Sequence, residues 1–78
     1  MPHVIVKMWP GRSDQQKKQL TEAIVKDVMD ALGAGEKWIS VAIEDVPQKD
    51  WAEKVYKPEI QKNLQKLFRK PGYTLEDL

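Results

Sequence analysis

The sequence predicts an α+β protein in which two parallel strands pair and one long helix crosses between them. Three observations predict this fold: two short β-branched runs at residues 3–9 and 38–45, an amphipathic run between them, and glycines and prolines at the borders. A strand, a helix and a second strand form a β-α-β unit, whose strands are parallel and whose crossover is right-handed. Apolar periodicity after residue 50 predicts C-terminal helices. We expect a single domain over residues 1–78, because 78 residues are too few for two domains.

The first predicted strand, residues 3–9, reads His-Val-Ile-Val-Lys-Met-Trp, and a Pro-Gly turn follows it. The helix should begin after Ser13, because Ser13 and Gln16 form a capping-box pattern in which each side chain bonds the other residue's backbone N–H. Gly33 and Gly35 supply the backbone freedom for a C-cap, so the helix should end at these glycines. The apolar residues in between recur at three- and four-residue spacing and are Leu20, Ala23, Ile24, Val28, Ala31 and Leu32.

The second predicted strand, residues 38–45, alternates bulky and small side chains. Three large aliphatic residues share one face, and Ser40 and Ala42 share the other. A two-stranded sheet covered by one helix leaves its other face and both edges open, and an isolated strand pair is marginal in water. We therefore expect a homo-oligomer that completes the sheet, with a site that uses residues of more than one chain.

The remainder of the chain is predicted to be helical up to residue 70. After Pro47, Asp50 is expected to be an N-cap, and Pro58 is expected to allow a second helix to start. The apolar stripe of these helices consists of Ile60, Leu64, Leu67 and Phe68.

Charge and composition argue against several functional classes. Lys and Arg number 13 against 12 Asp and Glu, so a net charge of +1 gives no reason to expect a nucleic-acid partner. The chain has no cysteine and one histidine, His3, so disulfides and thiol nucleophiles are excluded and we expect no metal site. No apolar run is long enough for a signal peptide or a membrane span, so we expect a cytoplasmic protein with no membrane partner.

Pro2 is the residue of most chemical interest. If Met1 is removed, the Pro2 nitrogen changes from an amide into a secondary amine, which is a potential general base. An α-amino group has a pKa of about 8, and burial or a cationic neighbour lowers that pKa toward neutral pH. A proline at this position is usually inert, so composition alone assigns it no role.

Three features of the sequence occur together. Pro2 precedes a strand, the run Gly11-Arg12-Ser13-Asp14-Gln15-Gln16-Lys17 opens the helix, and an aromatic residue, Trp51, follows the second strand. This combination resembles the 4-oxalocrotonate tautomerase family. In length, over residues 51–60 and at Lys70-Pro71-Gly72-Tyr73, the chain is most similar to the bacterial PptA-like (YdcE-type) subgroup.

The resemblance covers nearly the whole chain and implies a fold and an activity. The fold is a β-α-β protomer that assembles into dimers or larger rings. The activity is tautomerisation, an isomerase reaction that moves a proton between the enol and keto forms of small 2-oxo acids without a cofactor. The longer C-terminal segment would block ring closure, so we expect a dimer rather than a hexamer.

The resemblance also assigns roles to individual residues. Pro2 would be the general base and acid, Arg12 would bind the substrate carboxylate and draw electron density, and Trp51 would form an apolar wall. The family's second arginine is replaced here by Ser40, which has a hydroxyl donor but no charge. We therefore expect a monoacid substrate such as an aryl enolpyruvate. His3 receives no catalytic role, because a lone histidine on a strand is more often structural.

Two alternatives to this enzyme stay open. The missing second arginine is compatible with a non-catalytic module that binds small acids or serves in assembly. Within the superfamily, an N-terminal proline also serves water addition or dehalogenation of unsaturated acids. Those reactions need a further carboxylate or tyrosine, for which Tyr56, Tyr73 and Glu44 are candidates.

Overall fold

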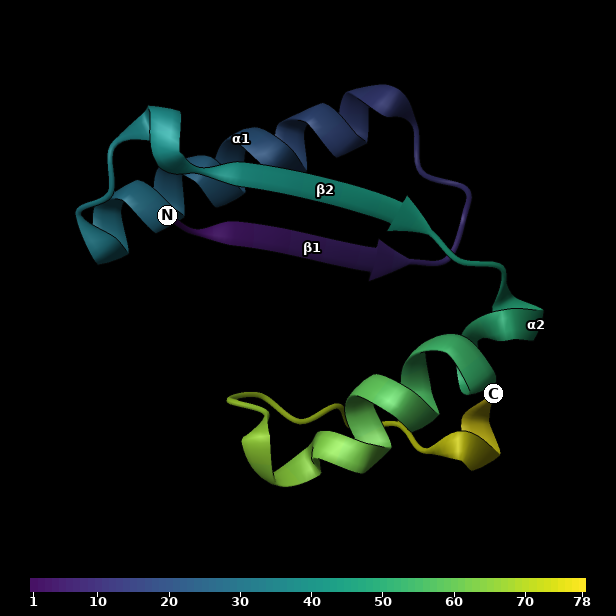
Figure 1. Cartoon of the computed structure of the whole chain (residues 1–78). Coiled ribbons are helices and arrows are strands. Elements are labelled where there is room, and N and C mark those ends of the chain that lie inside the picture. The colour runs from purple at the N-terminus through teal and green to yellow at the C-terminus, as the bar shows by residue number, and fades with distance from the viewer. The chain divides into compact units, whose positions relative to one another are not determined.

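The computed structural model describes residues 1–78, and the chain divides into two compact units, Met1–Asp45 and Val46–Leu78. The elements of the first unit are β1 (His3–Met8), α1 (Asp14–Leu32), a short 3-10 turn η1 (Glu36–Trp38) and β2 (Ser40–Asp45). β1 and β2 form a two-stranded parallel sheet, and α1 is the crossover between them (Figure 1). This arrangement confirms the predicted β-α-β fold, whereas the single domain stays a prediction.

Both ends of α1 form as the sequence predicts. Ser13 Oγ accepts the Gln16 N–H at 3.1 Å, and Gln16 Oε1 accepts the Ser13 N–H at 2.9 Å, which completes the capping box. Gly33 ends the helix with a φ of 66°, in the left-handed region that favours glycine. Lys17 Nζ donates to Asp45 Oδ2 at 2.9 Å and so joins the start of α1 to the end of β2.

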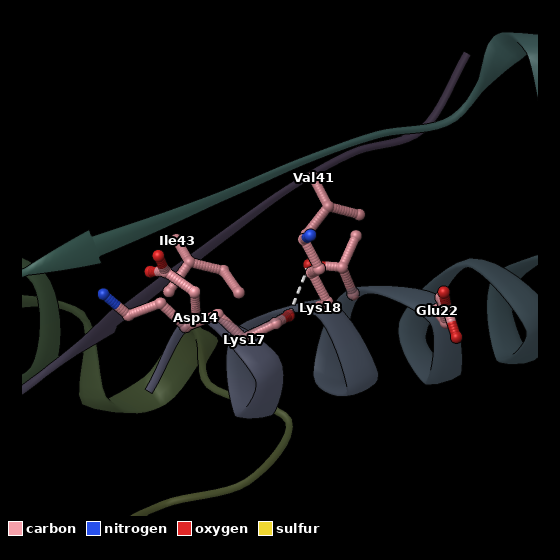
Figure 2. A pocket seen from close by; sticks show the side chains of 7 residues that line it. Asp14, Lys17, Lys18, Glu22, Val41 and Ile43 are labelled. Atoms are coloured by element: carbon pink, nitrogen blue, oxygen red, sulfur yellow. Dashed lines mark hydrogen bonds between the residues drawn. The ribbon is translucent and has the colours of Figure 1, made fainter. Parts of the chain in front are cut away.

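The register of the sheet places the first residues of both strands side by side. His3 pairs with Ser40, and the pairing continues to the ends of both strands. Val41 and Ile43 point toward α1 and, with residues of that helix, line a hollow of about 410 Å³ (Figure 2). Because side chains alternate along a strand, the other face of the sheet is open to solvent. This open face carries His3, Ile5 and Lys7 of β1 and Ser40, Ala42 and Glu44 of β2.

The second unit is helical and contains the two buried hydrophobic side chains of the chain. Its elements are α2 (Gln48–Trp51), a π-helical segment η2 (Ala52–Ile60), and two 3-10 segments, η3 (Gln61–Lys66) and η4 (Leu75–Asp77). Val55 and Tyr56 are 5% and 6% exposed and form the core. The Tyr73 ring lies 5.4 Å from the Tyr56 ring, and its hydroxyl accepts the Trp51 Nε1–H at 2.9 Å. Through these contacts, Tyr73 of the C-terminal segment packs against α2 and η2.

Two elements begin elsewhere than the sequence predicts. Trp38 belongs to η1 rather than to the second strand, because a 3-10 turn closes just before Ser40. α2 begins at Gln48 with Pro47 as its N-cap, so Asp50, the predicted cap, lies inside its first turn. Proline suits a helix start because it fixes φ and lacks the N–H that would otherwise stay unpaired there.

The rest of the second unit also differs from the prediction. Pro58 does not start a second helix, because the wider π-helical segment carries the chain through it. The helical run ends at Lys66 rather than at residue 70, since Leu67 is extended (φ −77°, ψ 128°). Phe68, predicted to join the apolar stripe, is fully exposed. No helix of the chain is both long enough and apolar enough to span a membrane.

Candidate active site

Pro2, His3 and Ser40 lie together at the start of the sheet, and we name these three residues the strand-start cluster. The Ser40 N–H donates to the Pro2 carbonyl oxygen at 3.2 Å. His3 Nδ1 lies 2.5 Å from Ser40 Oγ, in a hydrogen bond between the two side chains. Both contacts follow from the parallel register, which sets His3 opposite Ser40. The structure thus brings two predicted site residues together and adds His3 to them.

The Pro2 nitrogen gains basic character only when Met1 is removed. Met1 is 93% exposed, so its peptide bond to Pro2 is accessible to processing. Pro2 itself is half-buried. Partial removal from water favours the neutral form of an amine, which is the form that accepts a proton.

Arg12 lies at the opposite end of the sheet from the strand-start cluster. It follows the end of β1, where it lines a hollow of about 170 Å³ together with Met8 and the first turns of α1. Figure 1 shows the N-terminus at the start of the strands and the connection to α1 leaving from the arrowhead of β1. β1 has six residues and is about 20 Å long at about 3.3 Å per residue. An arginine side chain is far shorter, so Pro2 and Arg12 of one chain do not meet at one small substrate.

Trp51, the predicted wall residue, lies in the second unit, where a hydrogen bond from its indole to Tyr73 holds the ring. Of the two tyrosines that are candidates for water activation, Tyr56 is buried, and the Tyr73 hydroxyl accepts the hydrogen bond from the Trp51 indole. Glu44, the third candidate, is exposed on the open face, four residues beyond Ser40. Histidine and carboxylate side chains form no cluster of three or more that could hold a metal ion.

Nothing in the sequence pattern connects His3 with Ser40. Periodicity places both residues on strands, but the pairing register decides which side chains meet. Bulky and small residues alternate on the second strand but not on the first, so the sequence pattern does not determine the register that brings the pair together.

Comparison with known proteins identifies the family. The family described as "Tautomerase enzyme" matches residues 2–55. A probable tautomerase of Xylella fastidiosa (strain 9a5c) is 44% identical over 73 residues, which are 94% of this chain and 89% of that protein. Tautomerase PptA of Enterobacter sp. (strain 638) is 36% identical over 76 residues, or 96% of this chain and 100% of that protein. The crystal structure of YwhB, a homologue of 4-oxalocrotonate tautomerase, is 42% identical and superposes with a TM-score of 0.59 over 60% of this chain and 77% of its own.

These matches agree with the order of elements in the structure. The family match begins at Pro2 and includes β1, α1, β2 and α2. The curated relatives are named as tautomerases, which are isomerases. The chain therefore belongs to the tautomerase (4-oxalocrotonate tautomerase) family and is an enzyme of the isomerase class.

Proposed function

We propose that the chain catalyses enol–keto proton transfer in small 2-oxo acids such as aryl enolpyruvates, with Pro2 as general base and acid once Met1 has been removed. The observation that carries this proposal is the strand-start cluster, in which a half-buried Pro2 lies beside the hydrogen-bonded side chains of His3 and Ser40. Membership of the tautomerase family supports the reaction class.

The proposed reaction begins with a neutral Pro2 amine. The amine takes the proton of the enol hydroxyl, and the electron pair of the broken O–H bond forms the new carbonyl. The π electrons of the C=C bond then take a proton from the Pro2 ammonium at the neighbouring carbon, which restores the amine. Each cycle therefore moves one proton from oxygen to carbon and needs no other reactant.

We assign the remaining roles by chemistry. Arg12 supplies a planar, permanently charged donor pair for the substrate carboxylate, and it comes from a neighbouring chain because its own Pro2 is a strand length away. Ser40 supplies a hydroxyl donor beside Pro2. Trp51 supplies an apolar wall that excludes water and strengthens these interactions.

We propose that the chain acts as a homo-oligomer, and a dimer rather than a hexamer. No side chain of the first unit is buried, and Ile5, Trp9 and Trp38 are 51%, 41% and 48% exposed. A two-stranded sheet with this much exposed apolar surface needs a covering partner. Sedimentation velocity tests the size, and a stable hexamer would contradict the dimer.

The test of the reaction is the ketonisation rate of phenylenolpyruvate. We expect a rate well above buffer for protein whose intact mass shows the loss of Met1. Pro2→Ala should also lose Met1 but exchanges the rigid secondary amine for a primary one, so its rate should fall about 100-fold or more. The same sequence prepared with Met1 retained is the matched control and should be inactive, because its Pro2 nitrogen is an amide.

The alternative function is binding of small acids without turnover, and the uncharged Ser40 is the observation that favours it. Calorimetric titration with phenylpyruvate separates the two functions. Binding by processed protein whose ketonisation rate equals that of buffer would refute the enzyme and support the binding module.

A further inference from the structure

His3 and Ser40 form a hydrogen-bonded pair on the open face of the sheet. The two residues lie directly opposite each other in the parallel register, and Nδ1 lies 2.5 Å from Oγ. Both residues are exposed, and the Ser40 N–H also donates to the Pro2 carbonyl oxygen. In the single chain the pair is therefore exposed, and it lies next to the proposed base.

The pair presents one outward hydrogen-bond donor in either arrangement of its protons. When Nδ1 carries the proton, it donates to Oγ and leaves the Ser40 hydroxyl hydrogen for a ligand. When the hydroxyl donates to Nδ1, the imidazole proton resides on Nε2 and that N–H is left for a ligand. A single outward donor is complementary to a carboxylate or carbonyl oxygen, and its bond to a carboxylate is charge-assisted.

On the open face of the sheet, the other charged side chains lie away from the pair. Lys7 and Glu44, the other ionisable residues of the open face, pair with each other in register four residues further along their strands. That separation is about 13 Å at about 3.3 Å per residue. The charged residues of α1 that line the hollow with Val41 and Ile43 lie on the opposite side of the sheet. After Met1 is removed, the adjacent Pro2 nitrogen becomes an ionisable amine next to the pair.

We propose that His3 is a positioning residue for Ser40, and that the pair binds one oxygen of the substrate carboxylate beside Pro2. The inference rests on the proposed function and deepens it, because it adds a residue that governs substrate binding. The pair offers one acceptor oxygen a fixed donor, and Ser40 lacks the charge that would match a second carboxylate. The pair therefore favours monoacids.

His3→Asn and His3→Gln are the matched variants. Asparagine places its amide as many bonds from the backbone as Nδ1 and keeps the bond to Ser40, whereas glutamine places its amide where Nε2 lies and loses that bond. The probes are phenylenolpyruvate for kinetics and 3-phenylpropanoate, an unreactive monoacid, for binding. In His3→Gln and in Ser40→Ala, we expect KM and Kd to rise about tenfold while kcat stays nearly unchanged. In His3→Asn, we expect KM and Kd to equal those of the wild type. The double variant Ser40→Ala with His3→Gln should bind 3-phenylpropanoate no more weakly than either single variant, because both substitutions break the same hydrogen bond.

A measurement on the unmodified protein completes the test. His3 is the only histidine of the chain, so its ring signals in an NMR spectrum need no assignment. Titration with 3-phenylpropanoate should shift these signals, whereas its methyl ester, which keeps a carbonyl oxygen but has no charge, should shift them far less at the same concentration. Absence of the shift would overturn the inference, and so would equal affinities in wild type and His3→Gln, or an equal loss in His3→Asn and His3→Gln. A wild type that shows the shift and the variant pattern in Kd but no ketonisation would refute the proposed reaction and leave this inference standing.

Discussion

The separation of Pro2 from Arg12 predicts complementation between two inactive variants. The two residues lie at opposite ends of a strand that is about 20 Å long, so the proposed site takes Pro2 from one chain and Arg12 from another. Pro2→Ala removes the base from its own chain, and Arg12→Ala removes the carboxylate donor from a neighbour's site. Loss of a hydrogen bond to a charged group removes about 1.5–3 kcal/mol of binding free energy, so Arg12→Ala alone should lower kcat/KM about 10- to 100-fold.

Mixing the two variants should restore activity by a calculable amount. Equal amounts are unfolded together, refolded and assayed with phenylenolpyruvate. A site then has a one-in-two chance of an intact Pro2 and an independent one-in-two chance of an intact Arg12 from the neighbour, so about a quarter of wild-type activity returns. The fraction is the same for a dimer and for a larger ring, because each site uses two different chains. Each variant refolded by itself is the control.

A site built within one chain gives the opposite result. Every chain in the mixture then carries one damaged residue, and mixing yields no more than the mean of the two separate activities. That outcome, with mixed oligomers confirmed by native mass spectrometry, would refute the assignment of Arg12 to a neighbouring chain.

Three further substitutions test local interactions that stabilise the fold: a hydrogen bond, a helix N-cap and a glycine C-cap. Tyr73→Phe removes the acceptor for the Trp51 indole and should lower the free energy of unfolding by about 1 kcal/mol, measured by urea titration; the same change in a Trp51→Phe background should have little effect. Ser13→Ala removes half of the capping box and should cost about 1 kcal/mol in the same assay, while Ser13→Asp should retain most of the stability. Gly33→Ala should lower the free energy of unfolding by about 1 kcal/mol because of its φ of 66° alone, since no atom lies within 4 Å of the added Cβ. Gly72→Ala, which also has no atom within 4 Å of the added Cβ but has no positive φ, should leave the free energy of unfolding unchanged.

The sequence predicted the first unit well because its signals are local. The caps at Ser13 and Gly33 depend on residues within one helical turn, and the β-α-β order restricts the strands to a parallel pair. The second unit was predicted less well because neighbouring prolines and polar residues there provide competing start signals for a helix. Asp50 has the chemistry of an N-cap, but Pro47 starts the helix earlier, and Pro58 continues it through a π-helical segment.

The site was predictable in its residues but not in their arrangement. Pro2 and Ser40 are 38 positions apart in the sequence, and the register is what places them in contact. His3 was set aside because a single histidine gives no pattern, and its bond to Ser40 exists only in the paired sheet. For Arg12, the sequence indicated a role at the site, and the length of β1, about 20 Å, is the reason for proposing that this residue comes from a neighbouring chain.

The parallel topology links assembly to catalysis in this fold. In any parallel β-α-β unit, both strands begin at one end of the sheet, and the crossover leaves from the other end. A base on the first residue of a strand and a cation at the start of the crossover helix are therefore separated by the length of the strand, whatever their side chains. Lengthening a side chain does not close a gap of about 20 Å, whereas a second chain brings its own strand end to the first chain's strand start. We propose that the same partner covers the sheet whose apolar side chains are exposed in the single chain, so that one association both stabilises the first unit and completes the proposed site.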